Sequence, residues 1–460
     1  MSENDSKSMW WSGLSGYHWF VFSMASLAWL FDCLDQQIFL IARNDALTNL
    51  LPKGTTPEVI KEYGFTATSI FLIGWATGGM IFGSVGDRIG RAKTLTLTVF
   101  LYSVCTGLSA FSTGWLDFAA YRFLTGLGVG GVFGLAVALV ADGLPSKSRT
   151  GALGTLQALS AVGNITAGLI GIALAYLVST KQIDAASSWK YMFLVGAVPA
   201  FLCIFLQIKL KEPEAWVIAR KEGRTTGVKF GSYSSLFGEA EWRKSALFGM
   251  LLCIVGVIGV WGIGFMSPEL VKDVISRNLR EQGVDESAIP GMTKSWVSFN
   301  MICQNIGSFC GMLTFTYLAQ VIGRRKAFAI GFVAAMLATV GYFRCFNGVN
   351  DIWMSSVMGF CQLALFAGFA IYLPELFPLR LRSTGTSFCY NVGRFVAAAG
   401  VFGLGKLQTI LADRVTKANG GVTEKIDSFR DTCSYMSVIF LVGLVAIYFL
   451  PETKGREMPK

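Results

Sequence analysis

The sequence predicts an all-α membrane protein with twelve transmembrane helices in two pseudo-symmetric six-helix bundles. Of its 460 residues, 53% are hydrophobic and only 15% are charged, whereas a soluble domain normally carries about a quarter charged residues. Apolar segments recur along the whole chain, and a helix of about 20 apolar residues matches the roughly 30 Å thickness of the hydrocarbon core of a bilayer. Charged motifs also recur at equivalent places in the two halves.

Twelve apolar segments account for most of the chain. The first six are expected at 19–41, 66–86, 94–112, 116–141, 152–178 and 191–208. The next six are expected at 246–270, 296–319, 327–345, 352–374, 384–407 and 433–450. These positions predict an N-terminal bundle over 1–208, a cytoplasmic linker with short helices over 209–244, and a C-terminal bundle with a cytoplasmic tail over 245–460.

The distribution of basic residues predicts the orientation. The short loops 88–93 and 323–326 are dense in Arg and Lys, whereas the long loops 271–294 and 413–431 nearly balance their own charge. Loops rich in Lys and Arg remain on the cytoplasmic side of a membrane. We therefore expect both termini in the cytoplasm, in a multi-pass protein of the cell (inner) membrane.

Composition also argues against other classes of function. The net charge of +10 is spread over short clusters between apolar segments, so no nucleic-acid partner is expected. The ten cysteines are scattered singly and there is one histidine, which argues against a disulfide framework and a metal site. No nucleophile–base pair is recognisable, so we expect no enzyme activity and no cofactor. The expected partners are a small-molecule substrate, protons and the bilayer, for a functional monomer.

Two charged motifs each occur twice. The loop after the second segment reads GSVGDRIGRAK from Gly83, and the loop after the eighth reads QVIGRRK from Gln320. The fourth and tenth segments each end in an acid followed by Pro three residues later and Arg four residues after that, as Asp142-Gly-Leu-Pro145-Ser-Lys-Ser-Arg149 and Glu375-Leu-Phe-Pro378-Leu-Arg-Leu-Arg382. Repeated halves are the basis of alternating access, in which one half rocks against the other around a central site.

On these motifs the chain resembles the major facilitator superfamily over nearly its whole length. The loop at 83–93 is the most specific signature of that superfamily, and the second copy departs from it at Gln320, where the family usually has Asp. The acid–Pro–Arg elements and the tail Pro451-Glu-Thr-Lys-Gly455 resemble the sugar porters. The motifs Asp32-x-x-Asp35 and Arg122-Phe-Leu-Thr-Gly126-Leu-Gly128 are similar to the aromatic-acid/proton and sialate/proton symporters.

The charged motifs predict a gate at the cytoplasmic end. Asp87 at a helix end can accept hydrogen bonds from helix N-termini and arginines. Such contacts would hold the inner gate shut in the outward-facing state; the alternative is inner-side charge without a gating role. The candidate gating residues are Asp87, Arg88, Arg91, Asp142, Arg149, Arg324, Arg325, Glu375 and Arg382.

Two carboxylates in the first segment are candidates for proton coupling. Asp32 and Asp35 lie one helical turn apart, with Gln36 four residues after Asp32. An ionised group within a span is costly and asks for a function, and two close carboxylates do not both ionise easily. We expect one of them, Asp32 more than Asp35, to load and release a proton; the alternative is a wetted structural pair near the outer end.

Two arginines inside spans are candidates for binding an anion. Arg394 shares a helical face with Tyr390 and is the best candidate for holding a carboxylate of the solute. Alternatively, Arg394 pairs with a carboxylate of the first segment, or it belongs to a gate near the inner end. Arg122 lies closer to a membrane boundary. The alternative to solute binding is that its side chain snorkels to the boundary or pairs with Asp32.

Amides at helical spacing complete the predicted binding site, because they gain nothing by facing lipid. The candidates are Gln157, Asn164, Asn300, Gln304, Asn305, Gln362 and Asn391. Aromatic walls are expected from Trp75, Trp261, Phe265 and Tyr372, with core packing as the alternative for each.

These features predict proton-coupled symport of a small organic anion, such as a monocarboxylate, an aromatic acid or an acidic sugar. A neutral-sugar porter is the first alternative, because Gln157 stands where the sugar porters place a sugar-binding Gln and the 451–455 tail resembles theirs. A non-transporting solute sensor is the second alternative; such proteins usually carry long added loops or tails.

Overall fold

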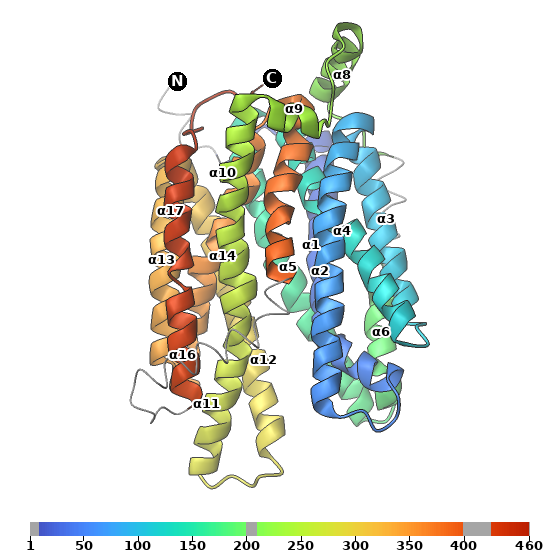
Figure 1. Ribbon diagram of the computed structural model, residues 1–460, viewed down its shortest axis with the longest axis vertical. Helices are drawn as coiled ribbons and strands as arrows, with labels where there is room; N and C mark the ends of the chain where they lie inside the picture. Colours follow the sequence, from blue (N-terminus) through green and yellow to red (C-terminus); the bar gives the residue numbers. More distant parts are fainter. Residues whose placement is uncertain (1–8, 199–208, 399–424, 460) are drawn as a thin grey trace.

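A computed structural model describes residues 9–198, 209–398 and 425–459, and within these ranges the secondary structure is helical, without strands (Figure 1). The helices of the N-terminal half are α1 (Gly16–Leu50), α2 (Pro57–Ile89), α3 (Arg91–Ser109), α4 (Trp115–Gly143), α5 (Ser146–Ser179) and α6 (Ser188–Val195). The polar stretch that follows contains α8 (Glu214–Thr226) and α9 (Tyr233–Gly238).

The helices of the C-terminal half are α10 (Ala240–Val257), α11 (Ser267–Glu281), α12 (Ile289–Val321), α13 (Arg324–Cys345), α14 (Trp353–Glu375), α16 (Lys425–Met436) and α17 (Ile439–Phe449). Residues 382–398 are also helical and are called the 382–398 helix. A π-helical segment, Ile258–Ile263, and a short 3-10 helix join α10 to α11, so the expected span at 246–270 is part of a longer rod.

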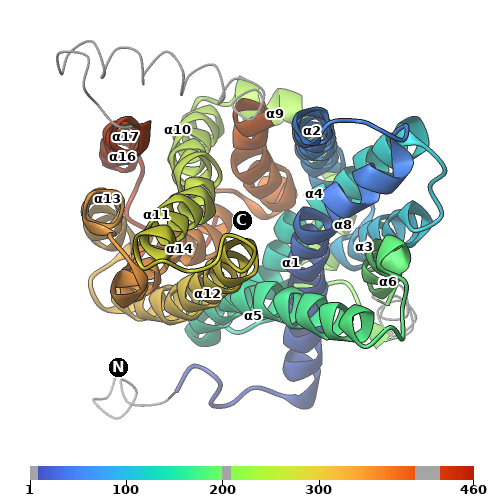
Figure 2. The ribbon, with the colours of Figure 1, turned by 90° about the horizontal axis from the view of Figure 1, so that it is seen from below.

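Eight helical segments in the described part of the chain are long and apolar enough to cross a membrane. The long helices run along the long axis of the molecule (Figure 1), and seen from one end they form two groups, α1–α6 and α10–α17 (Figure 2). The predicted segments at 191–208 and 384–407 extend into residues outside the described ranges.

Glycines allow a close helix crossing between α2 and α4. A Cβ added at Gly78 would overlap the backbone of Leu127, and one added at Gly130 would overlap the backbone of Trp75 and Gly79. Small residues let helix backbones approach in this way where apolar burial alone gives little drive, because lipid tails are as apolar as leucine.

The two ends of the bundle differ. The end that carries α8, α9 and the C-terminal tail, here called the α8 end, is the one at which α1 begins (Figure 1). The opposite end, here called the α11 end, carries the protruding hairpin of α11 and α12 (Figure 1). The two halves meet along α5 and α12, which lie side by side (Figure 2), and between α2 and the 382–398 helix.

Candidate functional site

Asp87, at the last turn of α2, connects the two halves at the α8 end. Its carboxylate accepts hydrogen bonds from the backbone N–H groups of Ser383 (3.2 Å) and Thr384 (2.8 Å), at the start of the 382–398 helix, and from the Thr384 hydroxyl (2.8 Å). A carboxylate at a helix N-terminus is stabilised by the unpaired N–H groups and the helix dipole. The predicted acceptor role of Asp87 is therefore realised by a helix of the opposite half.

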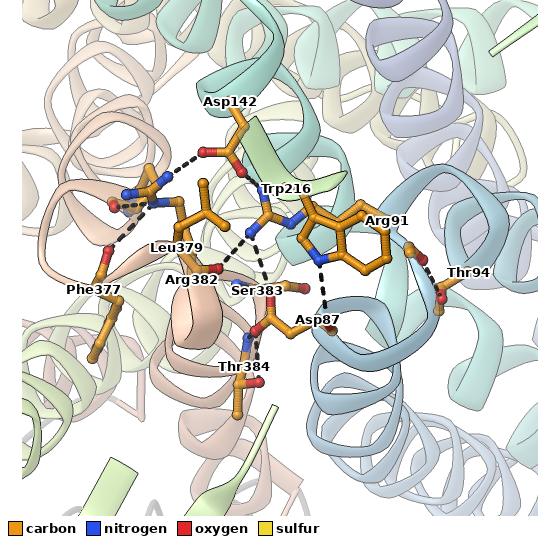
Figure 3. A network of polar contacts seen from close by, with 12 residues as sticks. Asp87, Arg91, Thr94, Asp142, Trp216, Phe377, Leu379, Arg382, Ser383 and Thr384 are labelled. Atoms are coloured by element: carbon orange, nitrogen blue, oxygen red, sulfur yellow. Dashed lines mark hydrogen bonds and ion pairs between the residues drawn. The ribbon is translucent and has the colours of Figure 1, made fainter. Parts of the chain in front are cut away.

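Three more charged residues extend this contact (Figure 3). Arg91 of α3 donates to Asp87 at 3.3 Å and to the backbone oxygen of Leu379 at 2.8 Å, and it forms an ion pair with Asp142. Arg382 also pairs with Asp142, at the end of α4. We call the set of Asp87, Arg91, Asp142 and Arg382 with the N–H groups of Ser383 and Thr384 the α8-end latch.

The polar stretch 209–244 is bound to the α8-end latch. The indole N–H of Trp216 donates to the backbone oxygen of Asp87 at 3.1 Å (Figure 3). The backbone oxygen of Gly231 accepts from the side chains of Ser84 (2.6 Å) and Arg88 (3.1 Å), while its N–H donates to the backbone oxygen of Arg380. Arg88 therefore contacts this stretch, which also reaches the C-terminal half.

The second copy of the loop motif forms a different contact between the halves. Arg324, at the start of α13, pairs with Glu375 at the end of α14 (2.8 Å) and donates to the Thr150 hydroxyl of α5 (2.9 Å). Arg325 donates to backbone oxygens at the end of α17, and Arg149 donates to the backbone oxygen of Leu144. With Gln320 in place of the usual acid, the bridge to the other half runs through Arg324.

Two glutamates that were not predicted from the sequence cap α3 and α13. Glu212 accepts from the N–H groups of Arg91 (2.7 Å), Ala92 and Lys93, and Glu452 accepts from those of Arg324 and Arg325 (both 3.0 Å). Burial raises the pKa of Glu452, but the N–H groups around it outweigh burial and hold that pKa below its ordinary value. The signal in the sequence is the Glu–Pro or Pro–Glu pair that follows each half.

Asp32 and Asp35 of α1 are both fully buried but have different neighbours. Asp32 accepts a hydrogen bond from Gln36 at 3.1 Å, and Arg394 acts on it electrostatically. Asp35 is close to Gly196, beyond the end of α6, and Arg122 acts on it electrostatically. The two acids are therefore under the influence of different arginines, although they are one turn apart.

Arg122 is buried within the N-terminal half and does not snorkel. It donates to the Ser109 hydroxyl at 2.6 Å, and its guanidinium carbon lies 4.8 Å from the ring centre of Phe193. Its electrostatic partner is Asp35, not Asp32 as in the predicted alternative. This position links Arg122 to Asp35 inside the bundle of α1, α3, α4 and α6.

Arg394 lies between the two halves and is only 1% exposed. One terminal nitrogen donates to the backbone oxygen of Tyr390 (2.5 Å) and to the side-chain oxygen of Asn391 (3.2 Å). The Asn391 amide donates in turn to the backbone oxygen of Gly130 on α4 at 3.2 Å. Within the described ranges Arg394 forms no ion pair with a carboxylate, and its Nε–H has no hydrogen-bond acceptor.

The other predicted amides do not gather around Arg394 as one stripe. Asn164 of α5 donates to Asn305 of α12 at 3.0 Å, which bridges the halves. Asn300 donates to Ser267 and accepts from Tyr342 within the C-terminal half. Gln362 donates to Thr339 at 2.7 Å, also within that half, and Gln304 is half-buried on α12.

Gln157 of α5 is buried, and its side-chain oxygen has no partner among the residues that the structure describes. The aromatic walls of the centre come mainly from Trp29, Trp75, Phe133 and Tyr390. Tyr390 stacks on Phe133 at 3.6 Å, and Trp75 meets Trp261 edge to face at 5.8 Å. Tyr372 instead bonds the backbone of Pro451, and the Phe265 side chain lies outside the described part.

Two helical halves, latched at one end and enclosing buried charges, are the architecture of a secondary transporter. A family model described as the Major Facilitator Superfamily matches residues 54–401. The chain belongs to this superfamily. It is therefore an integral multi-pass membrane transporter, not an enzyme, and its all-α fold has the architecture of this superfamily, which typically comprises twelve transmembrane helices.

Three curated proteins illustrate the similarity. A putative metabolite transport protein of Haemophilus influenzae is 26% identical over 97% of this chain and 99% of its own length. A probable 4-methylmuconolactone transporter of Cupriavidus pinatubonensis is 28% identical over 93% and 89%. A cis,cis-muconate transport protein of Acinetobacter baylyi is 25% identical over 73% and 79%.

Solved structures share the fold. The proton:xylose symporter XylE bound to 6-bromo-6-deoxy-D-glucose superposes with a TM-score of 0.71 and 17% identity, over 96% of this chain and 98% of that one. The inward open conformation of the same transporter from E. coli gives a TM-score of 0.59 with 18% identity, over 96% and 98%.

Proposed function

We propose that this transporter is a proton-coupled symporter for a small organic anion that carries a carboxylate. The main support is the environment of Arg394. This residue is buried between the halves, its Nε–H has no acceptor, and it forms no ion pair with a carboxylate in the described part of the chain. A permanently charged guanidinium in such a place requires an anionic partner. A solute carboxylate meets that requirement, and an Arg–carboxylate contact is short and directional.

The names of two relatives support this class of solute, because muconate and 4-methylmuconolactone are small carboxylates. Asn391 belongs to the same site because it contacts Arg394 directly. Gln157, Tyr390 and the Asn164–Asn305 bridge extend the predicted binding region on the surfaces that face the other half. Asn300 and Gln362 contribute through the packing of the C-terminal half rather than through the solute.

Proton coupling is assigned to Asp32. Asp35 and Arg122, which interact electrostatically inside the N-terminal half, are assigned a supporting role. In the proposed empty carrier, Asp32 gives up its proton and its charge offsets that of Arg394, which acts on it electrostatically. The loaded carrier balances Arg394 with the solute carboxylate while Asp32 carries a proton. Either ligand alone leaves an unbalanced charge between the halves, which is costly in a water-poor interior. Charge balance thus favours moving both together.

The α8 end is assigned to the cytoplasm of a cell (inner) membrane, on the basis of the Arg- and Lys-rich loops 88–93 and 323–326. With that orientation, the α8-end latch closes the inner side and the described state faces outward or is occluded. Gating then consists of breaking the latch and the Arg324–Glu375–Thr150 contact so that a monomer opens inward.

Uptake into proteoliposomes tests the substrate class. We expect radiolabelled 4-hydroxybenzoate or N-acetylneuraminate to enter protein-dependently, and Arg394→Gln to lower uptake at least about tenfold, as loss of a charge-assisted contact implies. A neutral hexose porter is the second candidate, favoured by buried Gln157. Hexose uptake that needs Gln157 but not Arg394 would replace the proposal with that candidate.

A further inference from the structure

Trp75 is the only ring of the first half, among the described residues, that lies over the charge of Arg394. The guanidinium carbon of Arg394 is 3.8 Å from the centre of the Trp75 ring and 4.4 Å from the centre of the Tyr390 ring. Trp75 belongs to α2, whereas Tyr390 and Arg394 belong to the 382–398 helix. Arg394 thus reaches across the interface and rests on an indole of the other half.

This contact stabilises the charge of Arg394 without using the N–H donors of its guanidinium. A cation over an aromatic face is attracted by the ring quadrupole, most strongly for tryptophan and more so when water is excluded. Trp75 is 1% exposed, so its contact with Arg394 is desolvated. A carboxylate in the same place would occupy the N–H groups of Arg394, whereas the ring face leaves them free.

The hydrogen bonds of Arg394 and Trp75 agree with a contact that stabilises the charge but does not use the N–H donors. In the described part of the chain the Nε–H of Arg394 and the indole N–H of Trp75 both lack an acceptor, although both atoms are buried. The acceptors that Arg394 does have are neutral groups on its own helix, Tyr390 and Asn391. Each of the two stacked side chains therefore keeps one buried donor without an acceptor.

We propose that Trp75 is a positioning residue that sets the preference for a carboxylate, by holding Arg394 at the interface with its Nε–H unoccupied. This inference rests on the proposed function, in which Arg394 binds the solute. Trp75 stabilises the guanidinium while the site is empty. The solute carboxylate then meets a donor group that is already in place, which lowers the cost of ordering the site.

A pair of ligands that differ only in charge tests the proposal. Affinities of the purified transporter for 4-hydroxybenzoate and for its neutral amide, 4-hydroxybenzamide, would be measured by competition binding at equal pH. We expect Trp75→Leu and Trp75→Met, which remove the ring, to weaken 4-hydroxybenzoate about tenfold and to leave 4-hydroxybenzamide within about twofold. Trp75→Phe, which keeps a ring, should retain most of the preference for the acid.

Two controls make the outcome specific. Trp115→Leu, at the start of α4 beside Tyr63, should leave the acid-to-amide ratio unchanged. In an Arg394→Gln background, Trp75→Met should change neither affinity further, because the effect runs through Arg394. The role of Trp75 is overturned if Trp75→Leu and Trp75→Met weaken both ligands equally, or if both variants keep the acid-to-amide affinity ratio of the unaltered protein. The proposed function stands in either case. No preference for the acid in the unaltered protein overturns both.

Discussion

Glu212 and Glu452 occupy equivalent places in the two halves, each capping the helix that follows a loop motif. Glu212 caps α3 and Glu452 caps α13. The residue before each helix is a glycine with positive φ, Gly90 at 123° and Gly323 at 93°. A Cβ at either glycine would overlap the capping carboxylate, and the backbone conformation itself favours glycine. The repeat therefore includes a capping device that lies outside the repeated loops in sequence.

The first prediction concerns Glu452 and pH. Because the pKa of Glu452 is below its ordinary value in the folded protein, ionised Glu452 stabilises the fold at neutral pH. That stabilisation is present above the ordinary glutamate pKa of about 4.3 and is lost as pH falls through the lower folded value. Glu452→Gln should therefore lower stability by about 0.5–1 kcal/mol at pH 7, a modest loss because Glu452 is partly exposed.

Thermal unfolding in detergent at pH 7 and at about pH 4, near the ordinary glutamate pKa, measures this difference. The difference in unfolding temperature between the unaltered protein and Glu452→Gln should be smaller at the lower pH. Glu457→Gln in the exposed tail serves as the control, with no change at either pH. A gap that widens on acidification would contradict the assigned sign.

The second prediction concerns the α8-end latch. Asp87→Asn removes the charge that receives two N–H groups and a hydroxyl from the other half and that faces Arg91. Hydrogen bonds to a charged group contribute about 1.5–3 kcal/mol each, so the latched state should lose most of its population. We expect the maximal uptake rate to fall at least about tenfold, with a smaller change in solute affinity. Asp45→Asn, at an exposed position of α1, is the control and should leave uptake unchanged. Normal uptake by Asp87→Asn would show that the α8-end latch has no part in the mechanism.

The third prediction concerns the opposite end. Lys61 of α2 and Glu269 of α11 form an ion pair at 4.0 Å, with side chains 59% and 48% exposed. Exposed pairs contribute about 0–1 kcal/mol. Lys61→Ala should therefore change the rate of uptake less than about twofold. Strong inhibition by Lys61→Ala, relieved in Lys61→Ala/Glu269→Ala, would show that the α11 end is held by this pair.

The fourth prediction concerns the crossing of α2 and α4. Gly78→Ala places a Cβ into the backbone of Leu127, whereas Gly168→Ala on α5 meets nothing within 4 Å. Overpacking typically costs about 1–3 kcal/mol, and a rigid backbone is the least yielding neighbour. Gly78→Ala should lower the yield of monodisperse protein and its unfolding temperature, and Gly168→Ala should change neither. Equal behaviour of the two variants would contradict the close crossing.

The sequence predicted the fold class and several contacts because local patterns carry them. Helical runs follow from hydropathy, and Asp87 follows from a charged motif at a helix end. The neighbours of Asp32 and Asp35 were not predictable, because one helical turn separates them by about 60° and packing decides which helix each meets. Trp75 was missed as a partner of Arg394, because contacts across the interface depend on how the halves dock. Glu212 was missed as the cap of α3, because it is distant in sequence and reaches α3 only through the path of the 209–244 stretch. The amide stripe of α12 divides for the same reason, with Asn305 at the interface and Asn300 inside one half.

In the proposed mechanism, buried Asp32 and Arg394 carry a proton and a carboxylate through the same passage. A pH electrode outside proteoliposomes measures this directly when 4-hydroxybenzoate is added, after subtraction of the signal from protein-free liposomes. The account predicts alkalinisation that disappears in Asp32→Asn and in Arg394→Gln, while Asp32→Asn still exchanges external for internal solute. Alkalinisation that persists in both variants, or solute entry without any proton movement in the unaltered protein, would contradict it.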